Sequence, residues 1–202
     1  TMSSIKEAEA AVTTATSNNI ETWCSMTVSD QNNKLLRSKE RLKTAIDHLD
    51  KFNHKVNLLN CSIPEAITVS LDCLKTNRRP FGAYANGFTS IDALEIGGTV
   101  DVLKSRQDLG PEEYFQQVMV WIKAGAKIIG GCCEISPKHI KYIYEKLNEL
   151  NSVGYRTDYL QYENSLYYTG SVMTNTKTNK RLRVVTFIDD KYKLQHQELE
   201  IN

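Results

Sequence analysis

Apolar residues follow two alternating patterns along this chain, from the N-terminus to about Leu150. Short continuous apolar runs are typical of buried strands, and apolar positions that recur every three or four residues are typical of amphipathic helices. Regular alternation of the two patterns indicates α/β architecture, in which helices cover a parallel sheet. The sequence therefore predicts an α/β fold over residues 1–150.

Prolines mark where several of the helices should begin. Pro64, Pro111 and Pro137 each stand at the start of a helical pattern, and the fixed φ of proline suits the first turn of a helix. The expected strands are residues 22–28, 55–59, 79–85 and 126–129, and the expected helices are residues 4–16, 34–51, 65–75, 112–124 and 138–150.

The pattern changes after Asn151. The segment that follows is rich in Thr and Asn and holds six of the ten tyrosines. Its apolar alternation is weak and favours only a short strand at 183–188 and a second candidate at 194–201. We interpret residues 151–202 as a tail of uncertain structure, attached to a domain formed by residues 1–150.

Composition and charge narrow the class of protein. Lys plus Arg number 25 against 24 for Asp plus Glu, so the formal net charge of +1 gives no field that would favour nucleic acid. The first residues lack a secretory leader, and no run approaches the ~18 apolar residues of a membrane span. Five cysteines, an odd number, do not suggest a disulfide framework. We expect a soluble cytoplasmic protein whose thiols are free to bind a metal.

Three cysteines occupy positions where chemistry usually collects in such folds. Cys61 follows the strand expected at 55–59, and the pair Cys132-Cys133 follows the strand expected at 126–129. The carboxyl ends of parallel strands meet at one edge of the sheet, where ligands bind. Three thiolates within about 2.3 Å of one ion would form a zinc site with an open fourth position. Gly130 and Gly131 would supply the conformational freedom and the space for two adjacent cysteines to meet one metal.

A second interpretation of these cysteines stays open at this point. Cysteine is often buried as a small apolar residue, and no CxxC or HxxxH pattern supports a metal. Cys24 within a strand and Cys73 on a helix are expected to be core residues. The four histidines are expected to be solvated or capping residues, which gives little support for acid–base catalysis.

A zinc ion held by three thiolates would be suited to one kind of chemistry. The site would be anionic, which makes the metal a weak Lewis acid towards water. It would instead favour holding a substrate thiol as a thiolate that attacks an electrophilic carbon.

Several motifs, in order along the chain, resemble those of the homocysteine S-methyltransferase family. They are Asn60-Cys61-Ser62 followed by Pro64-Glu65, the stretch from Pro80 to Asn86-Gly87, the segment Leu103 to Trp121, and Gly130-Gly131-Cys132-Cys133-Glu134 followed by Pro137, His139 and Ile140. The similarity runs from about Thr1 to Leu150.

The resemblance implies a (β/α)8 barrel whose zinc ligands match Cys61, Cys132 and Cys133. It implies a zinc-dependent enzyme of methionine biosynthesis that transfers a methyl group to the thiol of homocysteine. Methyl donors in the family include S-methylmethionine, S-adenosylmethionine, betaine and methylfolates. The non-folate members look most similar, and we expect S-methylmethionine or S-adenosylmethionine.

The similarity covers only the strands equivalent to five through eight, the C-terminal half of the barrel. An inactive, truncated remnant that acts as a zinc-binding or interaction module is therefore an alternative. A second half barrel is a further candidate partner.

Overall fold

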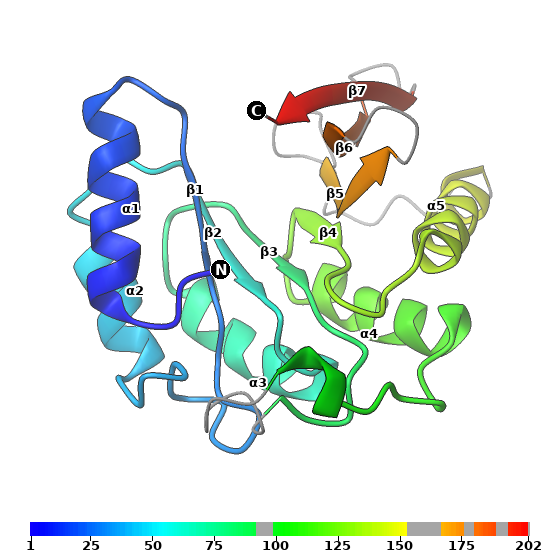
Figure 1. Ribbon diagram of the computed structural model, residues 1–202, viewed down its shortest axis with the longest axis horizontal. Coiled ribbons are helices and arrows are strands. Elements are labelled where there is room, and N and C mark those ends of the chain that lie inside the picture. The colour runs from blue at the N-terminus through cyan, green and yellow to red at the C-terminus, as the bar shows by residue number, and fades with distance from the viewer. Residues whose placement is uncertain (92–98, 153–166, 176–179, 189–193, 202) are drawn as a thin grey trace.

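The computed structural model describes residues 1–91, 99–152, 167–175, 180–188 and 194–201. Its main part begins with a helix and continues through consecutive strand–helix units (Figure 1). The elements are α1 (Ile5–Ser17), β1 (Trp23–Met26), α2 (Leu42–Leu49), β2 (Val56–Asn60), α3 (Pro64–Lys75), β3 (Phe81–Tyr84), η2 (Val100–Val102), α4 (Pro111–Lys123), β4 (Ile128–Gly130) and α5 (Pro137–Ser152).

Strands β1 to β4 form a parallel sheet in sequence order. In its register Cys24 lies opposite Asn57, Leu59 opposite Ala83, and Gly82 opposite Ile128. Gly82 is required there, because a Cβ atom would lie 2.3 Å from the carbonyl oxygen of Ile128. Consecutive parallel βα units with sequence neighbours side by side are the arrangement found in half of a (β/α)8 barrel. The expected α/β fold class is confirmed.

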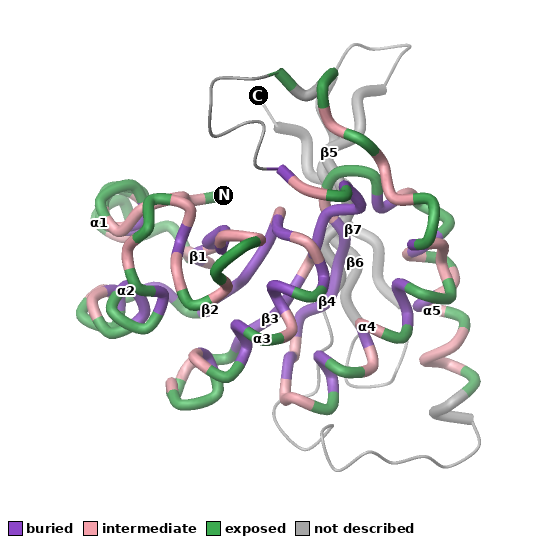
Figure 2. Tube along the Cα trace, turned by 90° about the horizontal axis from the view of Figure 1, so that it is seen from below, coloured by how far each residue is buried: buried purple, intermediate pink, exposed green. Residues whose placement is uncertain are grey.

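The two faces of this sheet bury different sets of side chains, because successive residues of a strand point to opposite faces. Figure 2 shows the buried residues following the strands and the inner sides of the helices, with exposed residues on the outer sides. The main core packs the helices against one face, and a smaller cluster of Val56, Leu58 and Ile128 forms on the other. The strand residues that belong to the main core include Cys24, Met26, Leu59, Phe81, Ala83 and Ile129.

Helix α2 is much shorter than the helix expected at 34–51. Residues before Leu42 form a loop in which Leu36 pairs with Val28 and Leu35 with Arg41 in isolated bridges. Leu36 is fully buried, but by this loop rather than by a helix face. The apolar spacing of a true helix begins only at Leu42, so the sequence interpretation merged a buried loop with the helix behind it.

The helix starts follow recognisable local chemistry. Ser4 and Glu7 form a reciprocal capping box at α1. Pro64 and Pro111 occupy the first turns of α3 and α4, and α5 begins at Pro137, as the sequence predicted.

Three further strands follow α5: β5 (Tyr167–Asn175), β6 (Lys180–Ile188) and β7 (Leu194–Ile201). β5 pairs in parallel with β4, and β6 and β7 continue the sheet in antiparallel order. The strands expected at 183–188 and 194–201 lie in β6 and β7, whereas β5 was not expected. The rest of the expected tail, residues 153–166, 176–179, 189–193 and 202, lies outside the described residues. None of the helices in the described part combines the length and apolar character needed to cross a membrane.

Candidate metal centre

Cys61, Cys132 and Cys133 come together at the carboxyl edge of the sheet. Cys61 directly follows β2, and the other two follow β4 after Gly131. Their sulfur atoms all lie within 4.8 Å of one another, and the Cys132 and Cys133 sulfurs are 3.7 Å apart. Cys61 and Cys132 are half-buried and Cys133 is exposed, so the cluster opens to solvent on one side.

Backbone hydrogen bonds to the last residue of β3 and to the residues after it hold both cysteine loops in place. The Cys61 amide donates to the Tyr84 carbonyl at 3.2 Å, and the Cys132 amide donates to the Ala85 carbonyl at 2.8 Å. The Gly87 amide donates to the Cys133 carbonyl at 2.8 Å. The end of β3 therefore lies between the two loops and fixes the distance from Cys61 to the cysteine pair.

In the turn around the cysteine pair, the role of glycine differs in part from the role that the sequence predicted. A Cβ atom on Gly131 would lie 2.2 Å from the Cγ2 atom of Ile135, so this position needs glycine for space. The left-handed backbone angles fall instead on Cys61, with φ 53°, and on Glu134, with φ 65°. The conformational freedom predicted for Gly130 and Gly131 is therefore supplied by residues that adopt the left-handed region at a cost.

Tyr114 of α4 joins the ends of β3 and β4 beneath the cluster. Its hydroxyl donates to the Gly130 carbonyl at 2.7 Å and accepts from the Ala85 amide at 3.1 Å. The side chain is fully buried, and burial raises the pKa of its hydroxyl, so it stays protonated as a donor. His139 stacks edge-on against it, with ring centroids 5.8 Å apart, and its Nε2 atom lies 3.1 Å from the Leu109 carbonyl.

The surroundings of the cluster favour the thiolate form of Cys61. Hydrogen bonds from Cys132 and Cys133 lower the pKa of the Cys61 thiol, and the positive charge of Arg37 lowers it further, against the opposing effect of burial. Hydrogen bonds to Cys133 and Cys61, together with burial, raise the pKa of Cys132. Three sulfurs that share a proton network of this kind are suited to exchange their protons for a metal ion.

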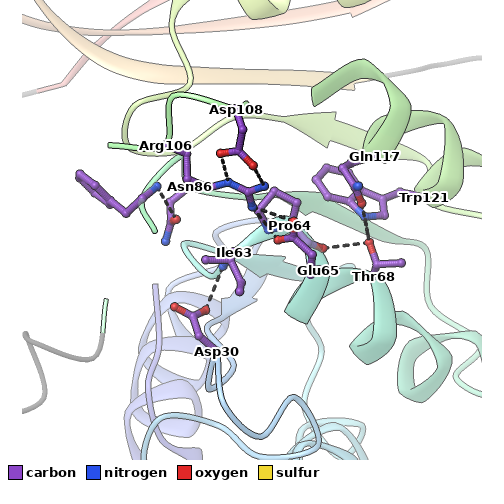
Figure 3. A network of polar contacts seen from close by, with 11 residues as sticks. Asp30, Ile63, Pro64, Glu65, Thr68, Asn86, Arg106, Asp108, Gln117 and Trp121 are labelled. Atoms are coloured by element: carbon purple, nitrogen blue, oxygen red, sulfur yellow. Dashed lines mark hydrogen bonds and ion pairs between the residues drawn. The ribbon is translucent and has the colours of Figure 1, made fainter. Parts of the chain in front are cut away.

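Arg106 joins the loop before α4 to the helix that follows Cys61. Its Nη1 atom lies 2.7 and 2.8 Å from the two carboxylate oxygens of Glu65, and its Nε and Nη2 atoms donate to Asp108 (Figure 3). The side chain is only 16% exposed. In the same network the Asp30 carboxylate accepts from the Ile63 amide at 2.9 Å, which links the loop after β1 to the start of α3.

The donor set fits a zinc ion. Tetrahedral coordination with Zn–S bonds of about 2.3 Å places neighbouring sulfurs about 3.8 Å apart. The 3.7 Å separation of Cys132 and Cys133 matches this edge, and the 4.8 Å limit on the other pairs requires only a small approach of Cys61. Three thiolates leave one of four tetrahedral positions free for a substrate atom.

The parallel α/β fold and the cluster of three cysteines define a class of α/β proteins with a candidate thiolate metal site. Comparison with known proteins identifies the family within this class. The model of the homocysteine S-methyltransferase family matches residues 1–147, so the chain belongs to the homocysteine S-methyltransferase family.

Two curated plant proteins are similar over part of the chain. Homocysteine S-methyltransferase 2 of Arabidopsis thaliana is 29% identical over 90 residues, which are 44% of this chain and 26% of that protein. Homocysteine S-methyltransferase 4 of Zea mays is 28% identical over 92 residues, 45% of this chain and 26% of that protein. The matched region thus spans about a quarter of the length of these relatives.

Solved structures of the homocysteine methyltransferase MmuM from Escherichia coli share the fold. The metallated form superposes with a TM-score of 0.55 at 21% identity, over 72% of this chain and 42% of that one. The oxidized form gives a TM-score of 0.52 at 22% identity, over 72% and 43% of the two chains.

Sequence reasoning located the three cysteines but not the groups that hold them. Cys24 and Cys73 lie outside the cluster, in or against the core, as expected. Tyr114 lies in the segment Leu103 to Trp121 that resembles the family, but the sequence did not predict its hydrogen bonds, and it did not single out Arg37. The expectation that the histidines are solvated or capping residues is wrong for His54, which is fully buried.

Proposed function

We propose that this chain is a zinc-dependent methyltransferase domain that acts on the thiol of homocysteine, with Cys61, Cys132 and Cys133 as the zinc ligands. The observation that carries the proposal is the convergence of the three sulfur atoms within 4.8 Å at the carboxyl edge of the sheet. Family membership and the fold shared with a metallated homocysteine methyltransferase support it. The product would be methionine, and the donor S-methylmethionine or S-adenosylmethionine.

Zinc, when bound, would lower the pKa of a thiol in its fourth position and so present a thiolate at neutral pH. The residues of the chain then have separate tasks. The cysteines hold the metal, and Tyr114 fixes the strand ends from which the cysteine pair projects. The exposed side of Cys133 leaves a route by which a small thiol can approach.

The choice of electrophile follows from the anionic character of the site. Three thiolates and one divalent ion carry a net charge of −1, which weakens the activation of a bound water and favours a soft sulfur nucleophile. A sulfonium methyl group is a matching electrophile, because its positive charge is lost in the transfer. This supports S-methylmethionine or S-adenosylmethionine as the donor.

The test is methionine formation by the reduced, zinc-loaded chain from homocysteine and S-methylmethionine, with S-adenosylmethionine assayed in parallel. Cys132→Ser should abolish the reaction, whereas Cys73→Ser, outside the cluster, should keep it. Stoichiometric zinc without methionine formation would contradict the enzymatic assignment and support the alternative of a zinc-binding module.

A further inference from the structure

We propose that Arg37 is the counter-charge of the three-cysteine site, a positioning residue whose guanidinium stabilises the anionic metal–thiolate cluster. This inference rests on the proposed zinc site and adds to it a residue from the loop between β1 and α2. The cysteines alone would leave the site with an uncompensated negative charge.

The guanidinium contacts the backbone of one of the three cysteines. Its Nη2 atom donates to the carbonyl oxygen of Cys61, so the positive charge lies beside a metal ligand. Arg37 is half-buried, and its buried Nε atom has no hydrogen-bond partner within the described ranges. A guanidinium that is partly removed from water is usually stabilised by a nearby negative charge, because the loss of hydration is costly. None of the ion pairs in the described part of the chain involves Arg37, which leaves the thiolate cluster as the negative charge that it faces.

The loop that carries Arg37 is held against the Cys61 loop. The neighbouring Leu36 is fully buried and pairs with Val28. The Ser62 hydroxyl accepts from the Val28 amide at 3.0 Å and donates to the Val28 carbonyl at 2.9 Å. Ser62 directly follows Cys61, so the charge and the ligand are fixed to one another through a short buried link.

The position of Arg37 beside Cys61 allows it to offset the negative charge of the proposed metal site. A divalent ion with three thiolates carries −1, and a substrate thiolate in the fourth position brings the cluster to −2. In a half-buried site, where the effective dielectric constant is about 20, a positive charge a few ångströms away is a substantial stabilising influence. Arginine suits the task because its guanidinium keeps its charge in every protein environment.

The experiment compares metal affinity in Arg37→Gln, Arg37→Lys and the control Arg41→Gln, using zinc competition with a chromophoric chelator at pH 7.5 under reducing conditions. Gln keeps an amide donor on a shorter side chain but carries no charge, whereas Lys keeps the charge. Arg41 is an exposed cation in the same loop, at the start of α2. We expect Arg37→Gln to weaken zinc binding about tenfold or more, Arg37→Lys to weaken it by less than about threefold, and Arg41→Gln to leave it unchanged.

Two further readouts separate charge from structure. The cobalt(II)-loaded variants should keep the thiolate charge-transfer band of the wild-type protein, because the ligands do not change. Raising the salt concentration should narrow the affinity gap between wild type and Arg37→Gln, because mobile ions screen a charge contribution.

Equal zinc affinity in wild type and Arg37→Gln would overturn the inference. So would equal weakening in the Gln and Lys variants together with an altered cobalt band, which would assign Arg37 a purely structural role. A wild-type chain that is folded but binds neither zinc nor cobalt would remove the proposed zinc site itself, and this inference with it.

Discussion

At the scale of single residues, Tyr114 connects the hydrophobic core to the loops that carry the cysteine cluster. It lies on the fully buried side of α4, and its hydroxyl bridges Gly130 at the end of β4 and Ala85 just after β3. A buried donor or acceptor that loses its partner costs about 1–3 kcal/mol. The Tyr114 hydroxyl satisfies one buried acceptor, the Gly130 carbonyl, and one buried donor, the Ala85 amide.

Tyr114→Phe should therefore lower the free energy of unfolding by about 2 kcal/mol or more and weaken zinc binding, because the Cys132 loop loses its support. Urea unfolding and chelator competition measure the two effects. Tyr142→Phe is the matched control, since Tyr142 is half-buried and its described contacts are made by its ring. If both variants behave like wild type, the hydroxyl does not position the loop.

Glu134 stores strain next to the cysteine pair. Its φ of 65° costs a residue with a Cβ atom about 1–2 kcal/mol, and its carboxylate accepts from the Ser105 hydroxyl at 2.7 Å. Glu134→Gly and Glu134→Ala both lose that hydrogen bond and differ only in the Cβ atom. We expect the Gly variant to be more stable than the Ala variant by about 1 kcal/mol in urea unfolding. A more stable Ala variant would contradict the left-handed backbone at this position.

The cysteines and their supports differ in how far the sequence could predict them. Cys61 and the Cys132-Cys133 pair were predictable because apolar runs locate the strands, and parallel strands end at one edge of the sheet. Arg37 and Tyr114 were not, because their contacts depend on how a loop folds back and on which strand a helix covers. Neither arrangement leaves a periodic signal in the sequence.

At the scale of secondary-structure elements, the strands and most helices follow the predicted positions, and the two exceptions have different causes. Leu36 is buried and Leu35 is half-buried in a loop with strand-like bridges, and apolar spacing alone cannot distinguish that burial from a helix face. β5 was missed because its sequence, rich in Tyr and Thr, lacks clear alternation.

The segment between α2 and β2 contains a pH-sensitive group. His54 is fully buried, its Nε2 atom lies 2.8 Å from the Asn57 side-chain oxygen, and its Nδ1 atom has no partner in the described part. Burial lowers the pKa of His54, and the nearby charge of Arg79 lowers it further, although the hydrogen bond to Asn57 opposes the shift. The folded chain therefore resists a proton that the unfolded chain accepts.

The direction in which stability changes with pH follows from this difference in the pKa of His54 between the folded and unfolded chain. Above about pH 6.5 the histidine is neutral in both states and contributes no pH dependence. As the pH falls below about 6.5, only the unfolded state gains the proton, and stability falls by up to about 1.4 kcal/mol per pH unit until the lower folded pKa is reached. Urea unfolding of the chelator-treated protein between pH 7.5 and 5 measures this slope. His54→Gln should flatten it, and an unchanged slope would assign the pH dependence to other groups.

At the scale of the whole molecule, β1 and β7 form the edges of the described sheet. The β1 edge already accepts a short parallel segment: the Met2 amide donates to Ser25 at 2.8 Å, and the Thr27 amide donates to Met2 at 3.0 Å. Pairing with a second half barrel stays a prediction for this edge. Light scattering tests it for self-pairing, since a mass near twice 22.9 kDa would support assembly and a mass of 22.9 kDa would count against it.

The central claim is that three cysteines from two strand ends form one zinc site. Its most direct test is the zinc content of the reduced, folded protein after metal loading and dialysis. We predict about one zinc per chain, loss of that zinc in Cys132→Ser, and its retention in Cys73→Ser. A folded wild-type chain without zinc, or a Cys132→Ser variant that keeps its full zinc content, would contradict the claim.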